Sequence, residues 1–214
     1  MVEKINFRDA VDNWKFFNRN TFKGQIATGL VTPNQGFRMF FLKTRDNDEF
    51  RIYVPAQNLE NLSISQGDFI MINGEIHSWN KPLIDGKRQG VIVSTFAKEI
   101  IPITKENCMN DEKHNQVVLV GNLRKDPFIK RRDGEITAES ILGIMDTKRD
   151  RKYYVPFVCK DDDAELLKNI CGFGDRIAIN GKLTTREYPK RKEDGTFETR
   201  ITTEVVAEEL QILR

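Results

Sequence analysis

The sequence predicts an all-β protein with short helices, in which one small domain occurs twice in tandem. Three observations support this: an internal repeat, the order of the elements within each copy, and a length of 214 residues, which allows two domains. Residues 67–76 (GDFIMINGEI) return 107 positions later as residues 174–183 (GDRIAINGKL), with six of the ten positions identical. A period of about 100 residues is too long for a solenoid, so we expect two collinear copies of one domain.

The repeat extends outward in order from these two segments, at offsets between 97 and 110. Gly24 matches Gly121 within an apolar run, and residues 91–103 match residues 201–213. A Tyr-Val-Pro tripeptide at residues 53–55 matches a second one at residues 154–156. Because the offsets change only slightly, the two copies should differ mainly in their loops.

The second copy reads as five strands with one helix before the fourth strand. β-branched runs and turn residues place the strands at residues 116–123, 136–145, 152–159, 176–188 and 197–213. Gly121 lies inside the first strand and predicts a bend or bulge there. Residues 161–170 carry apolar residues at helical spacing, and their three leading aspartates should cap the helix and oppose its dipole. This β-β-β-α-β-β order predicts a five-stranded Greek-key barrel of the OB (oligonucleotide-binding) type.

The first copy follows the same order and completes a protein of two tandem OB-fold barrels. Its strands are expected at residues 21–30, 37–44, 49–54, 69–79 and 90–101, with a short irregular or helical piece at residues 56–62. Residues 1–20 form an N-terminal extension, in which Val11, Trp14 and Phe17 at helical spacing predict a short amphipathic helix. The expected division is therefore residues 21–103 for the first domain, 104–115 for a polar linker and 116–214 for the second domain.

Composition excludes several classes of protein and favours none strongly. The net charge is +2, with 14 basic and 11 acidic residues in 1–105 and 20 and 21 in 106–214, so neither half is strongly basic. We expect no membrane span, no secretion signal and a cytoplasmic location, and the three cysteines lack a disulfide or zinc pattern. His77 and His114 are the only histidines, and no phosphate-binding or nucleophile motif occurs. The sequence therefore predicts neither an enzyme nor a bound metal or cofactor.

One family signature occurs in the second copy. The run VLVGNLRKDP at residues 118–127, the segment at 174–183 and TEVVA at residues 203–207 together resemble the bacterial single-stranded DNA-binding proteins, over about residues 115–213. The resemblance implies an OB barrel that stacks bases on exposed aromatic rings while lysines and arginines follow the phosphates. Tyr188 and Tyr153 fall at two stacking positions of the family, with one residue of uncertainty between Tyr153 and Tyr154. Two other aromatic positions are lost, at residues 146–148 and at Cys159.

The resemblance also implies an assembly and a biological setting. The family commonly uses four barrels, so two barrels in one chain suggest a homodimer. Cellular members usually end in an acidic tail that recruits partners, and this chain ends at Arg214 without one. A phage- or plasmid-type relative acting in replication, recombination or repair is therefore the expected setting.

The residues themselves point to the same ligand. Two loops of the second copy that an OB fold turns toward its ligand, residues 124–134 and 188–197, are rich in cations and contain aromatics, as base stacking and phosphate contacts require. If Ile76 and Leu183 face the core, strand alternation turns Trp79, Arg186 and Tyr188 outward. The candidate nucleic-acid-binding residues are Trp79, Lys81, Lys87, Arg88, Lys130, Arg131, Arg132, Lys148, Arg149, Arg151, Lys152, Tyr153, Arg186, Tyr188, Lys190, Arg191 and Lys192.

The sequence thus predicts binding of single-stranded DNA with little sequence preference, by aromatic stacking and contacts from lysine and arginine to phosphates. Several alternatives stay open. The basic loops can be ordinary solvated turns, and the outward aromatics can form a dimer interface. The ligand can be single-stranded RNA, or the barrels can be protein-interaction modules in which nucleic-acid binding is weak or lost.

Overall fold

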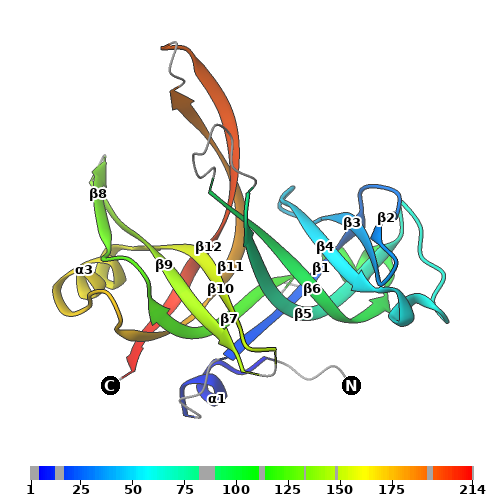
Figure 1. Cartoon of the computed structure of the whole chain (residues 1–214), viewed down its shortest axis with the longest axis horizontal. Helices are drawn as coiled ribbons and strands as arrows, with labels where there is room; N and C mark the ends of the chain where they lie inside the picture. Colours follow the sequence, from blue (N-terminus) through cyan, green and yellow to red (C-terminus); the bar gives the residue numbers. More distant parts are fainter. Residues whose placement is uncertain are drawn as a thin grey trace.

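The protein consists of two OB barrels that lie side by side and share one continuous sheet (Figure 1). The structure, a computed structural model, describes residues 5–12, 17–81, 90–110, 114–132, 134–147, 149–191 and 195–213. The strand order in the sheet is β2-β3-β4-β6-β5-β1-β7-β11-β12-β10-β9-β8, so β1 and β7 meet at the centre. The expected fold class is confirmed.

The elements of the first barrel are close to those predicted. They are β1 (Phe17–Ile26), β2 (Val31–Asn34), β3 (Phe37–Lys43), β4 (Glu49–Pro55), the 3-10 turn η1 (Ala56–Leu59), β5 (Phe69–Asn80) and β6 (Val91–Pro102). A short helix, α1 (Phe7–Asp12), precedes them.

The second barrel repeats this order after another short helix, α2 (Lys105–Met109). Its elements are β7 (Asn115–Leu123), β8 (Phe128–Arg132), β9 (Glu135–Asp146), β10 (Arg151–Lys160), α3 (Asp161–Ile170), β11 (Arg176–Arg191) and β12 (Phe197–Leu213). β8 was predicted as part of a loop, and no strand was predicted for the residues of β2. Each extends the next strand into a hairpin, because β2 pairs with β3 and β8 pairs with β9.

Both barrels close through a sharp bend in their first strand. β1 pairs with β5 and then, at Gln25 and Ile26, with β3; β7 makes the equivalent pairings with β11 and β9. At each bend a glycine allows two backbones to approach closely. A Cβ on Gly24 would lie 2.4 Å from the carbonyl oxygen of Lys43, and one on Gly121 would lie 2.4 Å from that of Gly143. The bend predicted from a glycine within the strand is therefore confirmed.

The duplication also extends to a side-chain bridge. The amide of Asn18 donates to the backbone oxygen of Ile76 and accepts from its N–H, at 2.7 and 2.8 Å. Asn115 makes the same two bonds with Leu183, at 2.7 and 3.0 Å. Each amide satisfies backbone groups next to the bulge at Gly74 or Gly181, where the ladder shifts register. Ile76 and Leu183 are fully buried, which confirms the predicted strand faces.

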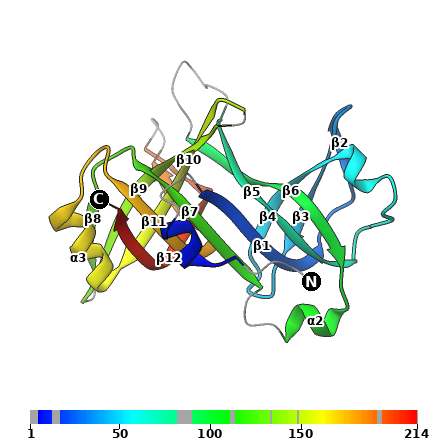
Figure 2. The ribbon, with the colours of Figure 1, turned by 90° about the horizontal axis from the view of Figure 1, so that it is seen from below.

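The barrels are joined by antiparallel pairing of β1 with β7, from Phe17 opposite Val120 to Phe22 opposite Asn115. Figure 2 shows α1 lying against β7 on the outer side of this sheet. There Ala10 is buried in a small cluster with Val118 and Val120, and Phe17 packs against its edge. Phe17 was expected in the helix, but it begins β1 instead because pairing with Val120 outweighs helical spacing; Trp14 lies outside the described residues.

The structure corrects one part of the predicted repeat. Ile52 on β4 lies beside Thr95 on β6, and Phe157 on β10 lies beside Val205 on β12. Thr95 lies two residues before Ala97, which pairs with the bulge residue Gly74. Val205 lies two residues before Ala207, which pairs with Gly181 in the same way. Tyr53 therefore corresponds to Val158, and the match between the two Tyr-Val-Pro tripeptides is wrong by four residues. The offset between equivalent residues then increases steadily along the chain, from 97 through 100, 105 and 107 to 110 for the successive strands of the barrel.

The helix of the second barrel also differs in detail from the prediction. Lys160, and not an aspartate, is its N-cap residue, and no side chain caps it. Asp161, Asp162 and Asp163 lie in the first turn, where their negative charges interact favourably with the helix dipole. Cys108, Cys159 and Cys171 are buried and form no disulfide. No helix in the described parts of the chain is long and apolar enough to cross a membrane.

Candidate nucleic-acid interface

A groove of about 840 Å³ lies on the outer face of the first barrel, where the second barrel meets it. β3, β4, β5 and β6 supply its floor, and the β9–β10 turn of the second barrel, with the start of β10, supplies one wall. Its aromatic lining is Phe37, Tyr53, His77, Trp79, Phe96 and Tyr153. We call it the aromatic groove.

The rings in the aromatic groove hold one another in place. Trp79 lies edge-on to Tyr53 at 5.3 Å between ring centroids, and 38% of its surface is exposed. His77 stacks between Phe96, at 4.7 Å, and Tyr153, at 4.2 Å. Tyr153 is only 5% exposed, so one face of its ring is taken by His77 and little of the rest meets solvent. Trp79 is therefore the most exposed of the described rings in the groove, and the half-buried Tyr53 lies edge-on beside it.

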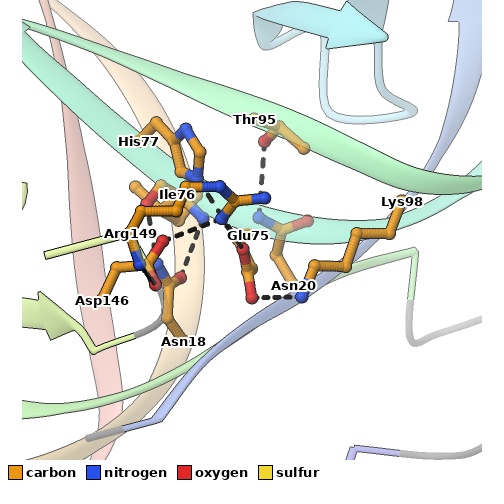
Figure 3. A network of polar contacts seen from close by, with 9 residues as sticks. All are labelled: Asn18, Asn20, Glu75, Ile76, His77, Thr95, Lys98, Asp146 and Arg149. Atoms are coloured by element: carbon orange, nitrogen blue, oxygen red, sulfur yellow. Dashed lines mark hydrogen bonds and ion pairs between the residues drawn. The ribbon is translucent and has the colours of Figure 1, made fainter. Parts of the chain in front are cut away.

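A polar network fixes the wall of the groove to its floor (Figure 3). The Glu75 carboxylate lies 3.4 Å from the Arg149 guanidinium and also pairs with Lys98. Arg149 in turn binds Asp146 at 2.8 Å, and the Tyr154 N–H donates to Ser78 Oγ at 2.6 Å. Burial alone would raise the pKa of Glu75, but hydrogen bonds from His77 and Lys98 lower it to about 2. Glu75 is therefore ionised near neutral pH and binds the β9–β10 turn to β5.

The cations that line the same wall are only partly paired with acidic side chains. Arg151 and Lys152 are exposed at the start of β10, and within the described ranges neither forms an ion pair. Among the lining residues only Asp150 is acidic, against three cations. Exposed aromatic rings beside unpaired cations form the arrangement that stacks bases and contacts phosphates.

Glu75, His77 and Asp146 are the one described group that could hold a metal ion, with one ligand atom of each within 4.8 Å of the others. The same two carboxylates already bind Lys98 and Arg149, which would have to leave before a cation could enter. The donor set therefore fits an ion-pair network better than a metal centre.

A second groove, of about 810 Å³, occupies the matching face of the second barrel. In the corrected register, Tyr53, His77, Trp79 and Phe96 are replaced by Val158, Thr184, Arg186 and Val206, all of which line it. Its charged lining is Lys130, Arg132, Lys160 and Arg186 with Glu135, Glu139 and Glu204. We call it the ion-paired groove, because acids and cations alternate in it and no aromatic residue lines it within the described part of the chain.

The sequence-predicted residues divide between several places. Arg149, Arg151, Lys152, Tyr153 and Trp79 line the aromatic groove, whereas Lys130, Arg132 and Arg186 line the ion-paired groove. Arg131 faces Glu165 on α3 at 3.8 Å, and Lys81 lines a smaller hollow of about 390 Å³ beside β12. Tyr188 and Arg191 lie on the β11–β12 hairpin, and neither lines either groove. Lys87, Arg88, Lys148, Lys192 and the side chain of Lys190 lie outside what the structure describes.

Sequence reasoning missed Tyr53, Phe96 and Phe37 as groove residues, and Glu139 and Glu204 as partners of the basic residues. Strand alternation could have found the first group, since Tyr53 and Phe96 each lie next to core residues, Val54 and Ala97. The glutamates carry no local signal, because their partners lie on other strands.

Comparisons with known proteins agree with this architecture. Residues 114–213 match the model of the single-strand binding protein family. Over 105 residues the chain is 35% identical to single-stranded DNA-binding protein 3 of Clostridium acetobutylicum, covering 46% of this chain and 70% of that protein. This chain belongs to the single-strand binding protein family. The single-stranded DNA-binding protein of Clostridium tetani is 36% identical over 105 residues, again 46% of this chain and 70% of that protein.

The family model matches only the second barrel, but the solved structures that resemble the chain cover both barrels. The wild-type single-stranded DNA-binding protein of Thermus aquaticus superposes with a TM-score of 0.67 at 17% identity, over 92% of this chain and 93% of that one. A deletion mutant of the same protein gives a TM-score of 0.68 at 19% identity, over 92% and 95%. At this identity the likeness concerns the fold, and it extends the tandem arrangement to a known example.

Proposed function

We propose that this member of the single-strand binding protein family binds single-stranded DNA with little sequence preference, and that the aromatic groove is its principal site. Single-stranded DNA binding follows from membership of the family. The observation that carries the choice of site is the pair of Trp79, which is 38% exposed, and the half-buried Tyr53, beside Arg151 and Lys152, which form no ion pair within the described residues. The setting we propose is replication, recombination or repair.

In this proposal each side chain has a defined role. Trp79 and Tyr53 stack on successive bases, and each base–aromatic contact contributes about 1–3 kcal/mol. Arg151 and Lys152 bind phosphates and release counterions from them. Tyr153, which the sequence predicted as a stacking ring, forms the wall and positions His77. Such contacts read the faces of bases and not their edges, so they tolerate any sequence.

The test is a fluorescence titration with oligothymidine. The chain has two tryptophans, so Trp14→Phe leaves Trp79 as the only reporter, and it lies in the proposed site. We expect quenching, with an affinity that falls as salt rises by a slope of about −0.7 for each phosphate contacted. Binding of oligothymidine by the Trp14→Phe protein without any change in Trp79 emission would place the site elsewhere. No binding even at low salt would reject the function itself.

Two alternatives have specific support in the molecule. Base stacking does not separate DNA from RNA, so a competition between matched DNA and RNA oligonucleotides belongs to the same titration. The ion-paired groove lacks described aromatic rings, which favours a weaker or different role for the second barrel, such as protein interaction. Loss of all binding in variants of the aromatic groove would favour this division of roles.

We also propose that the chain forms a homodimer. The support is the resemblance to a family that commonly assembles four barrels, of which one chain supplies two. Sedimentation equilibrium at several protein concentrations measures the assembled mass directly. A mass equal to one chain of 24.8 kDa at all concentrations would overturn the dimer and leave DNA binding intact.

A further inference from the structure

The basic residues of the second barrel are held by its own glutamates. Arg186 on β11 makes two hydrogen bonds to Glu204 on β12, at 2.9 and 3.2 Å. The same guanidinium lies 3.6 Å from Glu139 on β9, which also binds Lys130 on β8 at 2.5 Å. One chain of ion pairs thus crosses four strands around the groove.

The corresponding positions of the first barrel lack these acids. In the corrected register Glu204 corresponds to Ser94 and Glu139 to Met39, both uncharged. Arg186 itself corresponds to the exposed Trp79. The second barrel therefore has a Glu–Arg pair where the first barrel has a serine and a ring for stacking.

The ion pairs determine what a phosphate meets in this groove. A phosphate that approaches Lys130 or Arg186 must displace a carboxylate already in place, and it meets the negative charge of Glu139 and Glu204 as it enters. Glu204 is 8% exposed, so its charge is poorly screened by solvent. The groove thus contains the lysine and arginine of a phosphate site, but glutamates already neutralise their charges.

We propose that Glu139 and Glu204 attenuate the binding of the single-stranded phosphodiester backbone to the second barrel, by occupying Lys130 and Arg186. The inference rests on the proposed function of the protein. It makes the two barrels unequal by design: the first holds the strand, and the second adds a weak, salt-sensitive contact. Figure 1 shows the β8–β9 and β11–β12 hairpins rising on the same side of this barrel, so a strand in the groove would pass between them.

The test compares Glu139→Gln/Glu204→Gln with the unsubstituted protein, by anisotropy of a labelled oligothymidine of about 30 nucleotides, long enough to span two barrels. Glutamine keeps the shape of each side chain and removes the charge. Two cations released for phosphate contacts should steepen the salt slope by about 1.4. The affinity gain should therefore be about 25-fold larger at 50 mM salt than at 500 mM.

The controls separate this inference from its alternatives. Glu208→Gln removes an exposed acid that pairs with Lys182 at 2.7 Å and does not line the groove, so it should leave the slope unchanged. If the buried Glu204 variant fails to fold, Glu139→Gln alone should still steepen the slope, by about 0.7. Unaltered slopes in folded variants that bind DNA would overturn the attenuation and leave the proposed function standing. Failure of the unsubstituted protein to bind would instead reject the proposed function.

Discussion

The outer faces of the two barrels share one backbone and differ in chemistry. Both are built from the same four strand positions, the same glycine bend and the same asparagine bridge. In the first barrel this face carries Trp79, Tyr53 and Phe96, with cations supplied from the neighbouring barrel. In the second, Val158, Arg186 and Val206 take the places of these rings, and three glutamates also line the groove. The comparison teaches that duplication kept the residues that form the barrel and left the ligand face free to diverge.

The residues that were kept have backbone duties. Gly24 and Gly121 avoid a clash with a carbonyl oxygen, and Asn18 and Asn115 satisfy buried backbone groups. A change at any of them would leave a clash or an unsatisfied polar group, which costs about 1–3 kcal/mol or more. Outward-facing positions carry no such penalty, so they can change from tryptophan to arginine without loss of the fold.

The first and largest prediction tests whether the aromatic groove dominates. We expect Trp79→Ala/Tyr53→Ala to weaken oligothymidine binding by more than about tenfold, because each ring supplies about 1–3 kcal/mol of stacking. Anisotropy of a labelled oligonucleotide measures the loss without relying on tryptophan emission. Tyr188→Ala is the control, since Tyr188 lies on the β11–β12 hairpin and lines neither groove. A loss confined to the Tyr188 variant would move the site to that hairpin.

The second prediction attempts to abolish the difference between the faces. Val158→Tyr/Arg186→Trp/Glu204→Ser gives the second barrel the residues that the first has at positions 53, 79 and 94. Removing Arg186 and Glu204 together avoids leaving a buried charge unpaired. We expect about tenfold tighter binding of a 30-nucleotide oligothymidine and a longer occluded site.

The control for this exchange is Leu166→Tyr, which adds an aromatic ring on the exposed side of α3, away from both grooves. It should leave the affinity unchanged. A folded triple variant with no gain would show that the faces differ in more than these three side chains.

The sequence predicts the strands of the two barrels better than it predicts the side chains on their outer faces. Most strand positions followed from β-branched runs and from the repeat, because the segment around Gly74 and Gly181 is held by the bulge and changes little. The correspondence between β4 and β10 was not predicted correctly. A Tyr-Val-Pro tripeptide occurs in both strands by coincidence, at positions that differ by four residues from the true correspondence. With that error Tyr53 was matched to Tyr154, and the aromatic face of the first barrel was not recognised.

The site depends further on how the barrels meet. Tyr153 was predicted as an exposed ring, and it is buried because the β9–β10 turn packs against His77 of the other barrel. Lys130 was predicted as a phosphate ligand from its loop and Arg186 from strand alternation, and their glutamate partners come from different strands. Contacts between residues that lie far apart in the sequence leave no periodic pattern, so the alternation of residues in one strand cannot reveal them.

The third prediction concerns the charge that the second barrel supplies to the first. Arg151→Ala/Lys152→Ala should make the salt slope shallower by about 1.4 and reduce affinity at 50 mM salt, because two phosphate contacts are lost. Titrations at four salt concentrations give the slope. Lys168→Ala, on α3 and away from the groove, should match the unsubstituted protein. Slopes equal in all three proteins would remove the β9–β10 turn from the binding site.

The last prediction separates two ion pairs that occupy the same place in the two barrels with opposite polarity. Glu75 pairs with Lys98 in the first barrel, whereas Lys182 pairs with Glu208 in the second. Glu75 also binds a residue of the other barrel, Arg149. Its pKa is lowered from an ordinary 4.5 to about 2, so its contribution to stability is complete above pH 4.5 and is lost as the pH falls toward 2.

Urea unfolding at pH 6, 4 and 2.5 measures this contribution. Glu75→Gln should lower the midpoint at pH 6 and narrow the gap to the unsubstituted protein at pH 2.5, where the native carboxylate itself approaches protonation. Glu208→Gln should change the midpoint little at any pH, because an exposed pair contributes at most about 1 kcal/mol. Equal effects of the two substitutions would mean that the contact between Arg149 and Glu75 adds nothing to the junction. The wall of the aromatic groove would then be held by the Tyr153–His77 stack and the hydrogen bond from Tyr154 to Ser78.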